Sequence, residues 1–241
     1  MSGGGNLAAP KPAFTLAEVL VTLGIIGVVS AMTVPTLMQN HQRKTYVTQL
    51  HKVYNEVQQA ALHYITDHNA INLKEAGINS EDNAADFVKT YFKVVQDCGT
   101  EQTPCFAATE NYKKISGTTI TQWYGKRHFV LADGTALATF YIKGGGTGSL
   151  HLIEIWVDIN GQKGPNIAGR DLFVMYLYNN GILDDMAGKG GAGDDSEFAS
   201  SVPISAEARE KRFNNYCMSN IGANYHGCFG KILNDNWEMT Y

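Results

Sequence analysis

The feature that most constrains this sequence is a long apolar segment close to its N-terminus. Between Leu16 and Met38 the only charged side chain is that of Glu18, and almost all the other residues are aliphatic or small. A helix that packs on the core of a soluble protein usually carries a polar stripe, which this segment lacks. With its flanks, the segment has the roughly 20 residues that cross a bilayer as a helix. We therefore expect a membrane-spanning helix.

The single acid inside this segment needs an explanation. A carboxylate within a bilayer is costly, so such a residue is expected to have a partner. The segment contains no Lys or Arg, so a partner for Glu18 has to come from elsewhere. The alternative is that Glu18 lies at the level of the lipid headgroups and needs no partner.

Four cysteines follow the apolar segment as two close pairs, Cys98 with Cys105 and Cys217 with Cys228. An even number of cysteines beyond a membrane segment is typical of an oxidising compartment and two disulfides. Proximity in the sequence favours pairing within each close pair. A zinc site is the alternative, but the CxxC spacing typical of such sites is missing.

Residues 13–18 read AFTLAE and are followed by the aliphatic run from Val19 to Pro35. This arrangement resembles the cleavage and methylation signature of type IV prepilins: a small residue, then Phe-Thr-Leu-x-Glu, then a long aliphatic helix with a proline near its middle. The resemblance implies that a prepilin peptidase in the membrane cuts between Ala13 and Phe14 and N-methylates Phe14. Ala13 departs from the glycine that the family usually has before the cut.

The same resemblance implies how the mature chain assembles. The carboxylate of Glu18 would pair with the free amine of Phe14 on a neighbouring subunit, and Pro35 would bend the helix. The protein would be a single-pass inner-membrane protein with its head in the periplasm, and later part of a pilus or pseudopilus. Its partners would be other pilin subunits, the prepilin peptidase, the inner-membrane assembly machinery and, before assembly, membrane lipid.

After Met38 the chain becomes polar but keeps a helical pattern. Apolar residues recur at three- and four-residue steps: Tyr46, Leu50, Val53, Tyr54, Val57, Ala61 and Tyr64. Such a stripe is typical of an amphipathic helix. We expect one helix from Phe14 to about Thr66, with residues 14–36 in the membrane or filament core and 37–67 as its amphipathic half. Residues 1–13 would be the leader peptide and residues 68–241 the globular head.

The head is predicted to combine short helices with strands. Ser80 and Ser205 are candidate N-caps of helices over 81–95 and 206–217. Four segments are predicted strands or hairpins, the second centred on Asp133-Gly134: 118–124, 128–142, 150–158 and 171–178. The glycine-rich runs 144–146 and 188–195 predict loops. The expected fold is α+β, with the long helix packed on a small antiparallel sheet of three or four strands.

Short oxygen-bearing side chains surround a glycine turn after the third predicted strand. They are those of Asp158, Asn160, Asn166 and Asp171. Their spacing resembles the front of a calcium loop, although Gly169 stands where an EF-hand has its bidentate Glu. The alternative, which turn propensities favour, is a structural turn in which Asp158 and Asn160 bond their own backbone. Calcium is the only cofactor that the sequence suggests.

Nothing in the sequence predicts an enzyme. The GxSxG, HExxH and P-loop patterns are missing, and the seven histidines are scattered. The net charge of −4 and the lack of a long basic run make nucleic-acid binding unexpected. The leading hypothesis is a structural subunit of a type IV pilus or a type II secretion pseudopilus. The alternatives are a membrane-anchored minor pilin that binds a surface, DNA or a secreted substrate and, more remotely, a signal-anchored hydrolase.

Overall fold

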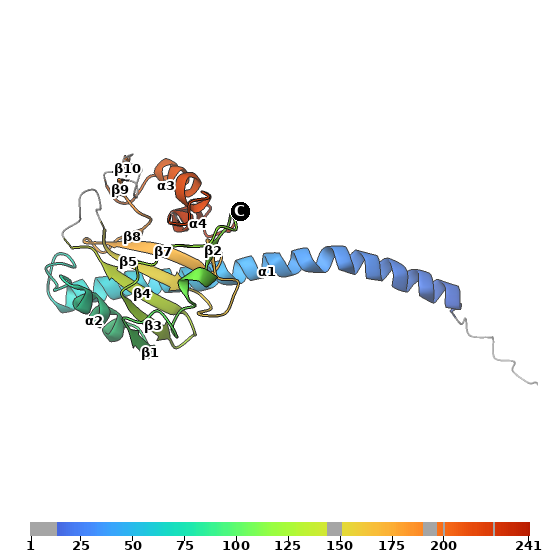
Figure 1. Ribbon diagram of the computed structural model, residues 1–241, viewed down its shortest axis with the longest axis horizontal. Coiled ribbons are helices and arrows are strands. Elements are labelled where there is room, and N and C mark those ends of the chain that lie inside the picture. The colour runs from blue at the N-terminus through green and yellow to red at the C-terminus, as the bar shows by residue number, and fades with distance from the viewer. Residues whose placement is uncertain (1–13, 144–150, 190–196, 200, 224) are drawn as a thin grey trace, which may run out of the picture. The chain divides into compact units, whose positions relative to one another are not determined.

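The computed structural model describes residues 14–143, 151–189, 197–199, 201–223 and 225–241 (Figure 1). The chain divides into an N-terminal unit, Met1–Gln42, and a globular unit, Arg43–Tyr241. Helix α1, Leu16–Asp67, is unbroken and contributes residues to both units. The prediction of one helix from Phe14 to about Thr66 is therefore confirmed. Pro35 lies inside this helix.

The globular unit is organised around the second part of α1. The buried residues of α1 recur at three- and four-residue steps, as the predicted stripe requires: Val47, Leu50, Val53, Val57, Ala60 and Ala61. They share one apolar core with side chains on one face of a sheet, among them Ile153, Ile155 and Val157. Burial of this stripe, at about 25 cal/mol per Å² of apolar surface, stabilises the helix within the globular unit.

The sheet has eight strands, and its order is β1-β3-β4-β5-β7-β6-β2, with β8 paired to β7. The strands are β1 (Val94–Gly99), β2 (Lys113–Lys114), β3 (Arg127–Leu131), β4 (Ala136–Tyr141), β5 (His151–Asp158), β6 (Ile167–Ala168), β7 (Leu172–Tyr178) and β8 (Leu183–Asp184). The pairings of β6 with β2 and with β7 are parallel, and the others are antiparallel. Central strands β5 and β7 are buried along their whole lengths.

The prediction of a small antiparallel sheet is therefore wrong in size and in strand direction, although the α+β class holds. Three of the additional strands, β2, β6 and β8, have only two residues each. Alternation of apolar and polar side chains cannot reveal so short a strand. The hairpin predicted over residues 128–142 is confirmed and consists of β3 and β4. The strands predicted over 150–158 and 171–178 are confirmed as β5 and β7.

Two predicted elements differ in extent or type. The predicted helix over 81–95 is α2, Glu81–Tyr91, and the chain then turns into edge strand β1, which pairs with β3. The predicted strand over 118–124 is wrong, since only an isolated bridge from Thr119 to Lys113 forms there. The side chains of Ile120 and Trp123 instead pack on a second buried core, which is separate from the core that α1 shares, and aromatic contacts there replace strand pairing.

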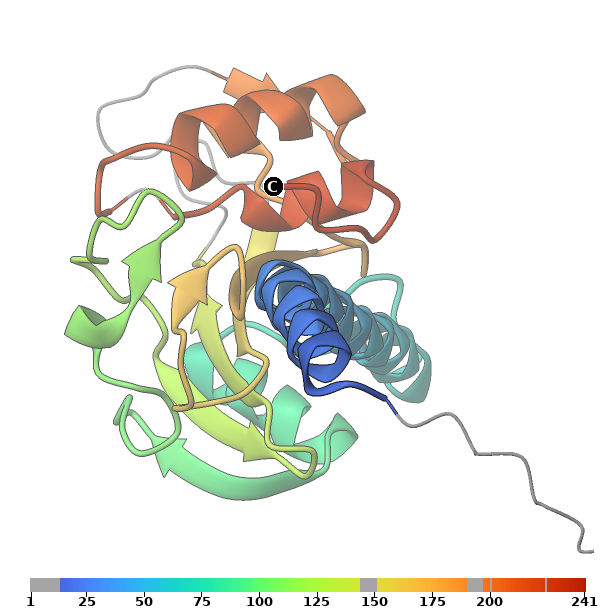
Figure 2. The same ribbon diagram turned by 90° about the vertical axis from the view of Figure 1, so that its right-hand side faces the viewer.

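The face of the sheet opposite α1 carries this second core, which includes Trp156, Tyr176 and Tyr178. Helix α3 (Ala206–Arg212) contributes Ala208 to this second core. The π-helical turn η2 (Phe213–Cys217) and α4 (Cys228–Asn234) instead contribute buried residues to the core that α1 shares, among them Phe213 and Phe229. Figure 2 shows α3 and α4 side by side. The short 3₁₀ helix η1 (Thr109–Asn111) and the pair β9 (Gly188–Lys189) and β10 (Glu197–Ala199) complete the described elements.

The predicted caps and loops have mixed outcomes. Ser80 accepts a hydrogen bond from the backbone N–H of Asn83, and Ser205 accepts one from that of Ala208, so both N-caps are confirmed. The predicted loop over 144–146 lies outside the described residues. In the predicted loop over 188–195, the first two residues form β9, and the others lie outside the described residues.

Candidate functional site

The start of α1 is closed by reciprocal hydrogen bonds between Thr15 and Glu18. The Glu18 Oε2 atom accepts from the backbone N–H and from the hydroxyl of Thr15, both at 2.8 Å. The backbone N–H of Glu18 donates to the Thr15 hydroxyl at 3.2 Å. This is a capping box, which satisfies backbone donors that a helix start leaves unpaired. The Thr-x-x-Glu spacing is a sequence signal for this motif.

The capping box changes the interpretation of Glu18. Both bonds from Thr15 use Oε2, so Oε1 is left for another donor. The cap is local, and Thr15 brings no positive charge. Glu18 can therefore close its own helix and still carry a negative charge that a neighbouring molecule could neutralise.

The first part of α1 could span a membrane by its length and composition. Its most apolar stretch has a mean hydropathy of 2.0, and none of that stretch is buried. Phe14, the expected first residue of the mature chain, is 88% exposed. Ala13, on the other side of the expected cut, lies outside the described residues.

All four cysteines form disulfides, Cys98–Cys105 and Cys217–Cys228, as proximity predicted. Cysteines in disulfides are not available to bind zinc, so the zinc alternative is wrong. The first bridge joins β1 to the loop that follows it, and the second joins η2 to the start of α4. The pairing places both bridges in the globular unit.

The structure brings the four predicted calcium ligands together in the connection between β5 and β7. Asp158 Oδ1 accepts from the Asn160 N–H at 3.2 Å, and its Oδ2 accepts from the Tyr112 hydroxyl at 2.6 Å. The two Asp171 oxygens accept from the N–H groups of Asn166 and Ile167 at 2.8 and 2.6 Å. These bonds are of the kind that the turn interpretation predicts.

Both carboxyl groups in this connection are fully buried. Burial raises the pKa of Asp158 to about 8, and the charge of Asp171 adds to the rise, whereas the Tyr112 hydroxyl acts in the opposite direction. Burial also raises the pKa of Asp171. Within the described residues no Lys or Arg pairs with either group. Two buried acids without a basic partner call for a compensating proton or cation.

The amide oxygens of the same connection fit a cation. The Oδ1 atoms of Asn160 and Asn166 are buried and find no hydrogen-bond donor in the described protein. Asn166 is only 9% exposed and holds a left-handed φ of 56°, which Asn tolerates better than most residues. Carboxylate and amide oxygens are the donors that calcium prefers. Asp158, Asn160, Asn166 and Asp171 therefore have suitable chemistry to hold one.

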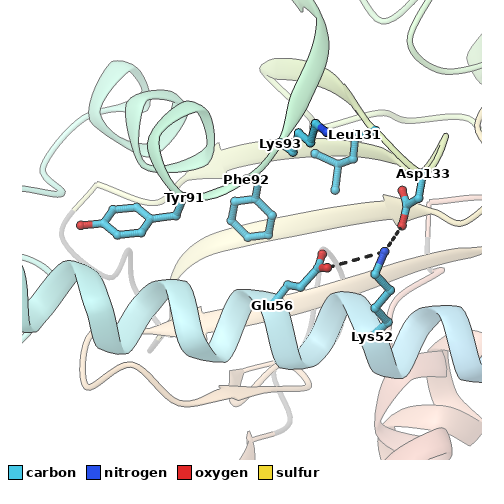
Figure 3. A pocket seen from close by; sticks show the side chains of 8 residues that line it. Lys52, Glu56, Tyr91, Phe92, Lys93, Leu131 and Asp133 are labelled. Atoms are coloured by element: carbon cyan, nitrogen blue, oxygen red, sulfur yellow. Dashed lines mark hydrogen bonds and ion pairs between the residues drawn. The ribbon is translucent and has the colours of Figure 1, made fainter.

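A cleft of about 400 Å³ lies between α1, the end of α2 and the β3–β4 turn. Figure 3 shows Lys52 of α1 directed toward Asp133, with Glu56 beside it. The Lys52 Nζ atom lies 2.7 Å from Asp133 Oδ2 and 3.6 Å from Glu56 Oε1. These ion pairs are largely exposed, and such pairs contribute little to stability. Tyr91, which also lines the cleft, donates its hydroxyl to Asp67 Oδ2 at 2.7 Å.

A buried polar cluster that was not predicted lies on the sheet face opposite α1. His151 Nε2 lies 3.3 Å from Glu154 Oε1, and the His151 ring packs edge-on against Tyr176 with centroids 4.7 Å apart. The Tyr176 hydroxyl is hydrogen-bonded to His226 Nδ1. His226 is distant in sequence from the strand residues, so no local pattern could have indicated the cluster. In the described chain no group of three or more His, Cys, Asp or Glu side chains is arranged to hold a metal.

Comparisons of the chain with protein-family models, with curated proteins and with solved structures found no match.

Proposed function

We propose that this protein is a subunit of a type IV pilus or a type II secretion pseudopilus, anchored in a membrane by its N-terminal helix before assembly. The observation that carries the proposal is the single helix α1, whose apolar, exposed first part begins directly after the expected cleavage site. The stripe of the second part is buried in the globular unit. A protein of this design presents an apolar helix to lipid or to the same helices of its neighbours.

Glu18 provides the polar contact in this assembly. After cleavage, the new amine of Phe14 carries the positive charge that the apolar segment lacks. Glu18 Oε1 accepts this amine from a neighbouring subunit, while Oε2 keeps the capping bonds to Thr15. Such pairing neutralises two charges that would otherwise be costly in an apolar filament core. It also determines the axial offset between neighbouring subunits.

Mass spectrometry of the protein isolated from native membranes tests the first step. We expect a mature chain that begins with N-methylated Phe14. Electron microscopy of sheared cell-surface or periplasmic fractions tests the second step, and filaments labelled by an antibody to the globular unit are expected. A mature chain that still begins with Met1 would contradict cleavage. Correct cleavage without filaments would favour the anchored binding module instead.

Substitutions at the helix start separate the two roles of Glu18. Glu18→Gln keeps an oxygen that can accept from Thr15 but removes the charge, so we expect membrane insertion without filament assembly. Thr15→Ala removes the hydroxyl of the capping box but keeps the backbone N–H bond and the charge of Glu18, so assembly should largely persist. Thr33→Ala is the control, because the Thr33 hydroxyl donates to the Val29 carbonyl of the same helix. If Glu18→Gln assembles like the wild type, the charge pairing is refuted.

We also propose that the connection between β5 and β7 binds calcium. Two observations support a bound cation: the unpartnered oxygens of Asn160 and Asn166, and two buried carboxyl groups with no basic partner in the described chain. Asp158, Asn160, Asn166 and Asp171 would supply oxygen ligands. A cation there would strengthen a connection that already bonds to Tyr112 and, through Asn160, to the Tyr46 hydroxyl of α1.

Thermal unfolding of the full chain in detergent, with calcium or magnesium added to chelator-treated protein, tests this. A ligand at about 100 times its Kd stabilises the folded state by about 2.7 kcal/mol. Asn166→Gly removes the amide oxygen but accepts the left-handed backbone, and it should abolish the effect of calcium. Asn69→Gly is the matched control, since exposed Asn69 has a φ of 48°. No rise in Tm at millimolar calcium, or an equal rise in Asn166→Gly, would remove the proposal.

A further inference from the structure

Basic side chains gather around the part of α1 where the globular unit begins. Arg43 and Lys44 are the first two residues of that unit. The connection between β5 and β7 brings further basic residues to the same region, because its Lys163 lines a cleft of about 510 Å³ together with Gln49 of α1. Gln49 lies within two helical turns of Arg43. We call four residues the basic collar: Arg43, Lys44, Lys163 and, from the same connection, Arg170.

Arg43 and Arg170 lie close enough for their charges to interact. Burial lowers the pKa of Arg170, and the charge of Arg43 lowers it further. The Arg170 guanidinium is held in place by Tyr241, because its Nη1 atom donates to the Tyr241 main-chain oxygen at 2.7 Å and the group lies 5.5 Å from the centre of the Tyr241 ring. Within the described residues neither guanidinium forms an ion pair with an Asp or Glu side chain. Two neighbouring cations without an acidic partner favour the binding of an anion.

The acids that the structure describes near the collar leave its charge available. Asp158, Asp171 and Asp185 are fully buried, so their carboxyl groups face the interior. A calcium ion bound by the first two would add positive charge to the region. Two further acids near the collar already have a lysine partner, at 3.2 and 2.7 Å: Asp235 with Lys231, and Asp133 with Lys52. The collar therefore presents a positive surface to solvent.

We propose that the basic collar binds the phosphate groups of anionic phospholipids at the surface of the bilayer that α1 spans; this inference rests on the proposed membrane anchoring. Arg43 follows Met38, the end of the apolar segment, by five residues, which is about 7.5 Å along a helix. That distance is shorter than the roughly 10 Å over which charges act in 0.1 M salt. A guanidinium group can donate two parallel bonds to a phosphate, and exposed Lys44 and Lys163 add charge attraction. These contacts hold the globular unit at the bilayer surface until assembly.

Reconstitution of the full chain into nanodiscs of phosphatidylcholine, with and without phosphatidylglycerol, tests the collar. Brief acetylation of the lysine amines, measured residue by residue by mass spectrometry, reports contact with the lipid. Phosphatidylglycerol should lower the labelling of Lys44 and Lys163 by about five-fold, and molar salt should abolish this protection. Exposed Lys74, beyond the end of α1, should be labelled equally in both bilayers. Equal labelling of Lys44 and Lys163 in the two bilayers would overturn the collar alone, whereas failure of the chain to insert into either would overturn the anchor and the collar with it.

Variants assign the protection to the arginine pair. Arg43→Gln removes one of two cations that repel each other and keeps a good helix former, so its Tm in neutral detergent should not fall. The protection of Lys163 by phosphatidylglycerol should fall about five-fold in this variant. Lys74→Gln, which removes one exposed charge outside the collar, is the matched control and should behave like the wild type. Unchanged protection of Lys163 in Arg43→Gln would refute the collar.

A soluble anion and a second copy of the chain are distinguished in phosphatidylcholine nanodiscs. Inorganic phosphate at millimolar concentration should leave the labelling of Lys44 and Lys163 unchanged there, because it lacks the high local concentration of a charged bilayer surface. Equal protection by free phosphate would overturn the assignment to lipid. Protection in phosphatidylcholine that appears only when a nanodisc holds two chains would overturn it as well, in favour of a contact between copies.

Discussion

Gly227 offers a direct test of how the C-terminal end of the loop between Cys217 and Cys228 is held. This residue is the N-cap of α4, has a φ of 86° and follows His226. A Cβ atom added there would lie 2.7 Å from the Arg212 carbonyl oxygen and 2.9 Å from its carbonyl carbon. These are backbone atoms at distances that real Cβ atoms do not tolerate, so the chain has to shift. Gly227→Ala is therefore expected to combine backbone strain with overpacking.

The expected loss in the free energy of unfolding is the sum of these two contributions. A left-handed backbone costs a non-glycine residue about 1–2 kcal/mol. Overpacking of a filled site adds about 1–3 kcal/mol. Gly117 is the matched control, because its φ is 85° but no atom lies within 4 Å of an added Cβ. Gly117→Ala should therefore show only the backbone contribution, and Gly227→Ala should exceed it by about 1–3 kcal/mol.

Thermal and urea unfolding of the full chain in detergent measure this difference. For a domain of this size, about 2 kcal/mol corresponds to about 4–8 °C in Tm. The hydrogen exchange of the Thr121 amide should also increase in Gly227→Ala but not in Gly117→Ala. Only Gly227 lies in the loop between Cys217 and Cys228, and the Gly222 carbonyl of that loop accepts from the Thr121 amide. Equal losses of Tm in the two variants would refute the argument from the Arg212 contact.

The remaining predictions concern the disulfides and the helix caps. Replacement of Cys217 and Cys228 by alanine should lower the free energy of unfolding by about 3 kcal/mol, as expected for the loop that an 11-residue separation closes. Replacement of Cys98 and Cys105, separated by 7 residues, should cost less in urea unfolding, and the reverse order would contradict this account. Ser80→Ala and Ser205→Ala should each lower stability by about 1 kcal/mol through loss of an N-cap. Exposed Ser201→Ala should not, and an equal loss there would rule out a capping effect.

Several elements could be predicted because their signals lie within a few turns of the chain. The stripe of α1, the Asp133-Gly134 hairpin, the two serine caps and the close cysteine pairs each depend on residues near one another in sequence. Local backbone preference and short-range burial determine such features. The capping box at Thr15 and Glu18 was equally local, and the Thr-x-x-Glu spacing would have revealed it.

Features that depend on distant residues could not be predicted in this way. The two-residue strand β2 joins the sheet by pairing in parallel with β6, across a gap of more than fifty residues. Residues 118–124 have strand-like composition, yet contacts of Ile120 and Trp123 with the second core prevailed over that local preference. The burial of Lys114 likewise depends on carbonyl groups of Tyr216 and Ile221.

The sequence by itself determined a long helix with an apolar first part, the single acid within it and two local disulfides, because each is expressed in the order and chemistry of neighbouring residues. Only the tertiary structure decided the size and order of the sheet, the burial of Asp158 and Asp171, and the meeting of His226 with Tyr176 and Glu154. These features arise when distant strands pair and exclude water between them. The energies of such contacts depend on which distant residues meet, and a local sequence pattern does not show which residues those are.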